Sequence, residues 1–168
     1  RGRTFDDEKP EIGVPVWYAV YADRSGVISP SSAMLKEPVM VLADVSSPRV
    51  IVNSGTVELA WQPPSNVHEV CVVRSDRGYP RTENDGQMVP LTSANAAVDR
   101  GLRNGRRYYY TLWSRFKDQD GVLRISKGLH VHATPEEPPA MIDCLEISSL
   151  GTGKGRALLV EWIRPPKG

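Results

Sequence analysis

The sequence is poor in the side chains that build disulfide frameworks and metal centres. It has two cysteines, Cys71 and Cys144, and neither belongs to a C-x-x-C pair or a cluster with histidine, so no zinc site is indicated. A disulfide between them is one alternative, but free thiols packed as small apolar groups are the better interpretation. Unpaired cysteines favour a reducing compartment, while a cell-surface or secreted location stays open.

The sequence also lacks an excess of charge and a long apolar run. Its formal net charge is +1, so no global field draws it to nucleic acid or to an acidic lipid surface. No apolar stretch approaches the roughly 20 residues of a membrane-spanning helix. Residues 1–13 have no apolar region of the kind found in signal peptides. We therefore expect neither a membrane span nor a nucleic-acid partner.

Recognisable catalytic motifs are absent. There is no Gly-x-Ser-x-Gly motif, and "GTGKG" at 151–155 lacks the spacing of a phosphate-binding loop. His130 and His132 alternate along a strand and are expected on one face, but the sequence offers no third ligand to complete a metal site with them. The sequence therefore predicts a chain that is not an enzyme and holds no cofactor and no metal ion.

Short segments with a period of two dominate what is present. Fourteen glycines and fourteen prolines separate them, and Asp-Gly pairs such as Asp85–Gly86 and Asp120–Gly121 favour tight turns. Apolar residues alternate with polar ones in "TVELAWQ", "YYYTLWS" and "LHVHAT", as in strands that are buried on one face. Many short strands separated by turns predict an all-β sandwich.

The sequence repeats itself at the scale of a domain. "VELAWQPP" returns as "LLVEWIRPP", which places Trp61 and Trp162 101 residues apart. "GVPVWYAVYADRSGVIS" returns as "GRRYYYTLWSRFKDQDGVLRIS", with its first glycine 92 residues later. A period of this size is typical of a β-sandwich domain rather than of a solenoid repeat.

The central repeat resembles a fibronectin type III domain. The resemblance rests on Trp61 with Pro63–Pro64 after an early strand, on "VHEVCVVRSD", on "VDRGLRNGRRYYYTLWS" and on "ISKGLHVHATPEEPP", in that order. It implies an immunoglobulin-like β-sandwich, and the segment after "VHEVCVVRSD" is similar to modules of large bacterial multidomain proteins. It also implies a tyrosine corner at Tyr108, a position that aligns with Val16 in the first copy.

The same resemblance divides the chain into three parts. Residues 1–40 are expected to be the C-terminal part of a first module, strands E to G. Residues 41–136 are expected to form a complete module, and residues 137–168 the N-terminal part of a third, strands A and B. Proline-rich junctions would stiffen the array. A partial sandwich exposes sheet edges and apolar faces, so we expect self-association through the partial modules or cover from other protein.

The aromatic segment 104–122 has both a structural and a functional interpretation. Alternation puts Tyr108, Tyr110 and Leu112 inside the sandwich, against Trp61. It puts Tyr109, Thr111 and Trp113 on the outer face of the sheet. An outward tryptophan there is either covered by long neighbouring side chains or anchors a protein partner, since tryptophan, tyrosine and arginine dominate interface hot spots. The candidate interaction surface comprises Trp113, Thr111, Arg115, Arg103, Arg106 and Arg107.

The basic residues of this segment leave two interpretations open. Arginine beside aromatic rings suits polyanions such as heparin. However, Asp99, Asp118 and Asp120 interrupt the basic run, which favours an ordinary solvated surface of mixed charge. The sequence as a whole predicts a non-catalytic tandem segment that acts as spacer and protein-interaction scaffold in a larger protein. The alternatives are a polyanion- or carbohydrate-binding module, or an accessory region of an enzyme whose catalytic domain lies outside this chain.

Overall fold

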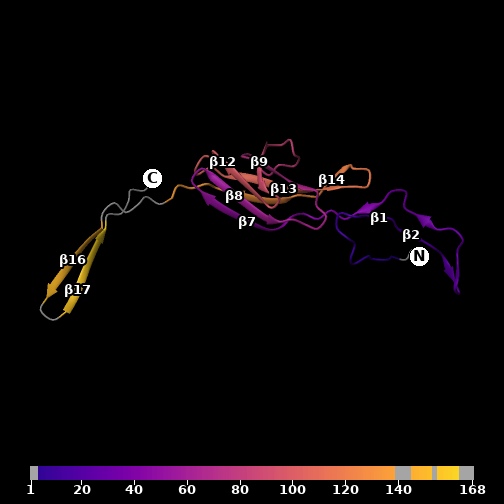
Figure 1. Cartoon of the computed structure of the whole chain (residues 1–168), viewed down its shortest axis with the longest axis horizontal. Coiled ribbons are helices and arrows are strands. Elements are labelled where there is room, and N and C mark those ends of the chain that lie inside the picture. The colour runs from indigo at the N-terminus through magenta and orange to yellow at the C-terminus, as the bar shows by residue number, and fades with distance from the viewer. Residues whose placement is uncertain (1–3, 139–144, 153–154, 163–168) are drawn as a thin grey trace. The chain divides into compact units, whose positions relative to one another are not determined.

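The computed structural model describes residues 4–138, 145–152 and 155–162, and the regular structure in these ranges is entirely β-strand (Figure 1). The chain divides into two compact units, residues 1–136 and 137–168. Within the described ranges there is consequently no helix with the length and apolar character that crossing a membrane requires.

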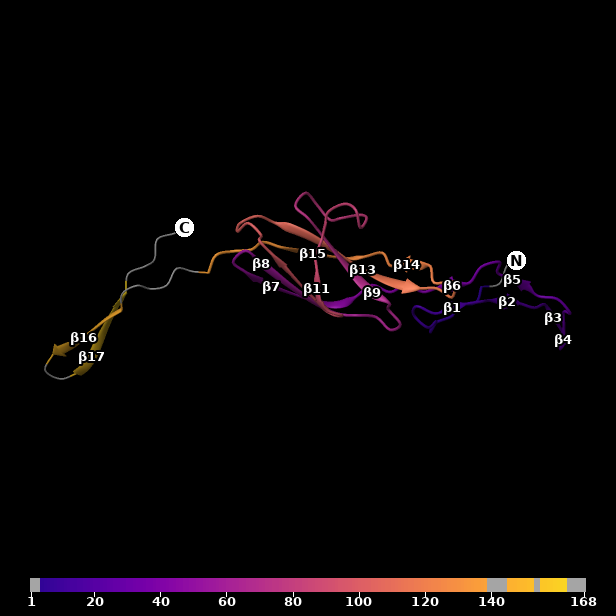
Figure 2. The same cartoon turned by 45° about the horizontal axis from the view of Figure 1, so that its top comes forward.

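The central part of the first unit is a sandwich of two antiparallel sheets (Figure 2). Buried side chains alternate with less buried ones in the strands Thr56–Gln62 and Ala96–Arg100 of one sheet, because that sheet buries one face against the other. The first sheet has the order β11 (Leu91–Ser93), β12 (Ala96–Arg100), β8 (Thr56–Gln62) and β7 (Ser46–Asn53). The second has the order β10 (Gln87–Met88), β9 (Glu69–Ser75) and β13 (Tyr108–Lys117), and both β14 (Leu123–Ile125) and β15 (Leu129–Ala133) pair with β13.

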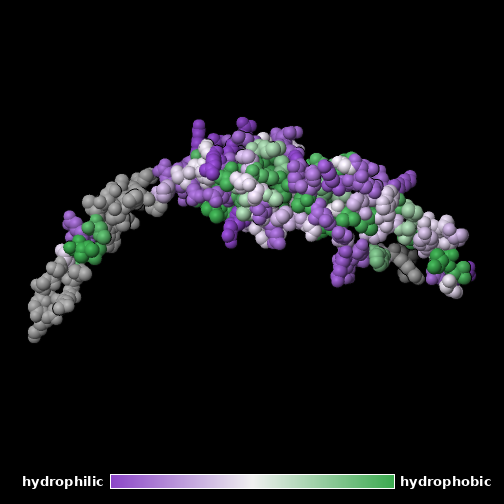
Figure 3. Space-filling view, in the orientation of Figure 1, coloured by the Kyte–Doolittle hydropathy of each residue, from purple (hydrophilic) through white to green (hydrophobic). Residues whose placement is uncertain are grey.

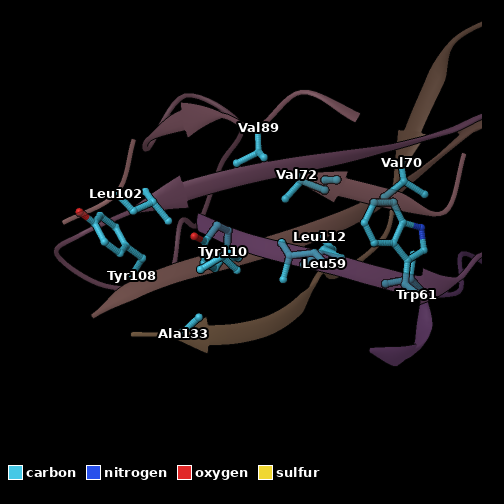
Figure 4. Close-up of a cluster of buried hydrophobic side chains, with 13 residues drawn as sticks. Leu59, Trp61, Val70, Val72, Val89, Leu102, Tyr108, Tyr110, Leu112 and Ala133 are labelled. Carbon is cyan, nitrogen blue, oxygen red and sulfur yellow. The ribbon is translucent and has the colours of Figure 1, made fainter. Parts of the chain in front are cut away.

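The core lies between these two sheets, as the alternation predicts. Trp61, Tyr110 and Leu112 are each at most 4% exposed and belong to one buried cluster with side chains from both sheets (Figure 4). Burial of such large apolar side chains contributes about 1.5–3 kcal/mol each. The prediction of an all-β immunoglobulin-like sandwich is confirmed, and so is the interior position of Tyr108, Tyr110 and Leu112.

One end of the sandwich is fastened by the turn before β13. The backbone N–H of Arg103 donates to the hydroxyl of Tyr108 at 3.0 Å, which confirms the tyrosine corner. The N–H of Leu102 donates to the carbonyl of Gly55 at 3.0 Å, and that of Gly105 to the carbonyl of Pro135 at 2.7 Å. This turn therefore joins the β7–β8 hairpin and the segment that follows β15.

Before the sandwich, the chain forms a narrow antiparallel ladder of two-residue strands. Three pairs are nested within one another, with the turn at Ser25–Gly26 at the tip. Many of its apolar side chains are exposed, among them Val20 at 69% and Val27 at 73%, and apolar surface gathers at the tip in Figure 3. The pairs are β1 (Pro15–Val16) with β6 (Val39–Met40), β2 (Ala19–Val20) with β5 (Ala33–Met34), and β3 (Asp23–Arg24) with β4 (Val27–Ile28).

The base of the ladder is docked on the sandwich. Phe116, near the end of β13, is fully buried, and a Cβ on Gly13 would lie 2.6 Å from its ring, closer than atoms can pack. Gly13 has φ +74°, which favours glycine as well. The side-chain amide of Asn66 donates to the carbonyl of Ile12 at 3.0 Å and to the carboxylate of Glu11 at 3.2 Å.

The second unit is a hairpin of β16 (Leu145–Thr152) and β17 (Gly155–Trp162), paired in register along their whole length. Leu145 and Ile147 alternate on β16 and are 62% and 60% exposed. Cys71 is free and buried, as the sequence suggests, whereas Cys144 lies outside the described residues.

Candidate interaction surface on the outer face of β13

A loop covers the outer face of β13. It comprises residues 76–86, here called the strap, which follows β9 and precedes β10. The hydroxyl of Thr111 donates to the carbonyl of Pro80 at 2.8 Å, which ties the strap to the middle of β13. The carboxylate of Asp85 accepts from the N–H groups of Arg81 and Thr82 at 2.9 and 2.8 Å. Hydrogen bonds from Thr82 and from these N–H groups lower the pKa of Asp85 and hold the strap in a closed turn.

The strap changes the expected role of Trp113 and Thr111. Both lie on the outer face of the sheet, but Trp113 is 4% exposed and Thr111 is fully buried. Trp113 packs with Cys71 and Val73 in a second, smaller apolar cluster outside the main core. The expectation that these two side chains are open to a partner is therefore wrong, because a segment remote in sequence covers them.

Arg115 is engaged within the chain. Its guanidinium contacts Glu69 at 2.7 Å and Glu83 of the strap at 2.5 Å. The hydrogen bond with Glu83 is the main cause that raises the pKa of Arg115. Because Arg115 already pairs with both carboxylates, it links the strap to the sheet and is not free to bind an anion.

Aromatic contacts that the sequence did not reveal hold Tyr79 of the strap against β13 and β15. The ring of Tyr79 stacks on His130 with centroids 4.5 Å apart, and meets Tyr109 edge-on at 5.1 Å. Its hydroxyl lies 3.1 Å from Nδ1 of His132. The two histidines do share one face, as predicted, but their neighbour is a tyrosine. Within the part of the chain that the structure describes, no three potential metal ligands gather.

The three remaining candidate residues lie at the other end of β13. Arg103, Arg106 and Arg107 are exposed around the turn that precedes the strand, and Arg106 forms an ion pair with Asp76. Since a strand rises about 3.3 Å per residue, Arg107 and Arg115 are roughly 25 Å apart. The structure thus separates the six candidate residues into a covered set and an exposed set.

A hollow stays open beside the strap, where β14 gives way to β15. Its volume is about 380 Å³, and Trp113 contributes to its wall. Gly128, with φ +95°, lies so close to Trp113 that a Cβ there would be 2.6 Å from the indole nitrogen. This strap hollow is lined by Arg81, Thr82, Glu83, Asn84, Trp113, Ile125, Ser126 and Lys127.

Comparison with known proteins places the sandwich in a family. Residues 45–134 match the family model described as "Fibronectin type III domain SaeA third domain". No curated protein matches the chain.

Three solved structures are among those to which the chain is similar. A computationally redesigned β-sandwich protein is 17% identical, covers 60% of this chain and 97% of its own, and has a TM-score of 0.46. An Fn3-like protein from Clostridium thermocellum is 18% identical, with coverage of 60% and 97% and a TM-score of 0.40. A fibronectin type III domain of the human KIAA0970 protein is 18% identical, with coverage of 67% and 88% and a TM-score of 0.43.

Proposed function

Because the chain belongs to the fibronectin type III family, we propose that it is a non-catalytic spacer and protein-interaction scaffold within a larger protein. Modules of this family generally serve as scaffolds or spacers and commonly mediate protein interactions. The fold itself hosts many roles, so the proposal rests on particular features of this chain.

The observation that carries the spacer role is the docked base of the ladder. Phe116 is fully buried where Gly13 closes on it, and Asn66 holds the backbone of Ile12. A junction fixed by a buried aromatic ring and a direct hydrogen bond keeps two neighbouring parts of a chain in one orientation. A spacer needs this property, because a freely hinged junction would not set the distance between its ends.

We extend the proposal to the flanking segments. Residues 1–40 would be the last strands of a preceding module, and residues 137–168 the first strands of a following one. The exposed apolar rows of the ladder and of β16–β17 support this division, since a completed sandwich buries such rows. In the 168-residue chain we expect them to associate with the same rows of a second copy.

Substitution of Gly13 tests the spacer role. Gly13→Ala introduces a Cβ against Phe116, whereas Gly26→Ala at the tip of the ladder imposes the same backbone strain with nothing within 4 Å. Backbone ¹⁵N relaxation would report how tightly the ladder tumbles with the sandwich. We expect the ladder to tumble independently in Gly13→Ala only. Independent tumbling in the unsubstituted chain would refute a rigid spacer.

A further inference from the structure

We propose that the strap hollow and the adjoining β14 strand bind an extended segment of a partner protein in which apolar and acidic side chains alternate. The proposal rests on the scaffold function above and names the chemistry of its partner. Three observations carry it: an exposed apolar row on an edge strand, cations beside that row that form no ion pair in the described ranges, and a hollow at its end.

The apolar row lies on β14. Leu123 and Ile125 are 42% and 43% exposed, and pairing of Ile125 with Arg115 places the row on the same outer face as the strap. Among the described strands β14 pairs only with β13, so its other edge is free. Exposed apolar edge strands readily pair with an added strand, a recurring mode of peptide recognition.

The cations beside this row make no direct ion pair with another described residue, although the charge of Arg81 does act on Asp85. In the described ranges, the side chains of Arg81, Lys117 and Lys127 make no ion pair. The surrounding carboxylates are mostly engaged, but in the described ranges Asp120 at the preceding turn and Glu37, which lines a hollow with Arg124, make no ion pair. Glu69 and Glu83 bind Arg115, Asp85 binds the strap backbone, and Asp118 binds Arg124. An acidic segment would therefore find free cations and few competing carboxylates.

The hollow fits side chains rather than a stacked nucleobase. Its volume of about 380 Å³ lies within the range of pockets that hold small organic groups. Trp113 forms part of the wall but is only 4% exposed, so it offers no open ring face. Binding of single-stranded nucleic acid relies on open ring faces and a basic groove. Trp113 and Ile125 are the apolar part of a lining that is otherwise polar and includes the two cations Arg81 and Lys127. This mixture favours a peptide that carries both apolar and carboxylate side chains.

A defined peptide tests the proposal on the whole 168-residue chain. The probe is a fluorescein-labelled octapeptide of alternating valine and glutamate, and fluorescence anisotropy reports its binding. We expect sub-millimolar affinity, a loss of about tenfold in the Arg81→Glu/Lys127→Glu variant, and a similar loss in Ile125→Ser. The matched control is Arg49→Glu/Ile51→Ser on the other sheet, where Ile51 is 46% exposed, and it should bind as the unsubstituted chain does.

Further probes separate the outcomes. An octapeptide of valine and lysine should bind at least tenfold more weakly, and N-methylation of alternate backbone nitrogens should weaken the acidic probe if it pairs with β14. The proposal is overturned if the acidic probe does not bind, if the lysine probe binds equally well, or if the control variant loses binding equally. Binding of a heparin oligosaccharide in place of the acidic probe, lost in Arg81→Glu/Lys127→Glu, would overturn it in favour of a polyanion site. The relaxation test of Gly13→Ala does not depend on any of these results.

Discussion

Tyr110 donates a hydrogen bond of 2.9 Å from its hydroxyl to Oδ2 of Asp99, inside the sandwich. Asp99 is 6% exposed, and Nη1 of Arg74 contacts its two oxygens at 2.9 and 3.1 Å. These three residues come from β12, β13 and β9, so one buried carboxylate links the two sheets. The sequence interpretation placed Asp99 on the basic surface as an interrupting charge; its burial shows that it belongs to the core instead.

Removal of the Tyr110 hydroxyl should destabilise the sandwich. Tyr110→Phe leaves one oxygen of a buried carboxylate with fewer donors, and we expect a loss of about 1.5–3 kcal/mol in the free energy of unfolding, as for hydrogen bonds to charged groups. Urea denaturation measures the change. Tyr21→Phe, at a ring that is 54% exposed, is the control and should leave the midpoint unchanged. Equal midpoints for both variants would show that Asp99 does not need this donor.

The same pair predicts a loss of stability at alkaline pH. Burial and the negative charge of Asp99 raise the pKa of Tyr110 above its usual value. Because the pKa of Tyr110 is higher in the folded than in the unfolded chain, the unfolded chain loses this proton first as pH rises. The contribution of Tyr110 to the free energy of unfolding is therefore complete below about pH 10 and falls as pH rises further. The unfolding free energy of Tyr110→Phe should therefore fall less steeply than that of the unsubstituted chain between about pH 10 and pH 11.5. Parallel curves would contradict the prediction.

Gly128 should be far less tolerant of substitution than Gly121. Both have positive φ, +95° and +76°, but only Gly128 faces other atoms, with Trp113 and Thr111 within 3 Å of a built Cβ. We expect Gly121→Ala to cost about 1–2 kcal/mol from backbone strain alone and Gly128→Ala to cost at least 1 kcal/mol more. Thermal unfolding compares the two. A smaller loss for Gly128→Ala would mean that the β14–β15 junction moves aside easily.

The Cys71 thiol should report opening of the strap. It is 5% exposed, and burial raises its pKa, which lowers the fraction of reactive thiolate near neutral pH. In a Cys144→Ser background, we expect Cys71 to react with a thiol reagent at least 100-fold more slowly in the folded than in the unfolded chain. Thr111→Val removes the hydrogen bond to Pro80 and should raise the folded rate about fivefold or more. Thr92→Val, at an exposed position of the other sheet, is the control; an equal rise there would show that global unfolding exposes the thiol.

The main sandwich could be predicted because the pattern of each strand lies within a short stretch of sequence. Alternation places Trp61 on the apolar face of β8, and Tyr110 and Leu112 on that of β13, without reference to any other segment. The tyrosine corner was implied by the family resemblance, and the pattern that carries it is also local, since Tyr108 and its donor Arg103 lie five residues apart. In both cases a short stretch of sequence contains the whole pattern.

The covered surface could not be predicted in the same way. The burial of Thr111 depends on Pro80, which lies 31 residues earlier in a strap that has no periodic pattern. Arg115 looks free in the sequence because Glu69 and Glu83 become its neighbours only when β9 and the strap are in place. Gly128 was an available signal, since a glycine directly before a strand leaves room for the close approach of another group, here Trp113.

The positions of β7 and β15 determine how the sandwich would respond to mechanical tension. Force applied before β7 and after β15 would pull each strand along its own axis, against β8 and β13 respectively. In that geometry the hydrogen bonds of each ladder are sheared together instead of opening one after another. The turn that joins Gly105 to Pro135 would add resistance at the point where the force leaves. We therefore expect the module to extend abruptly, at a well-defined force, when a single molecule is pulled by its ends.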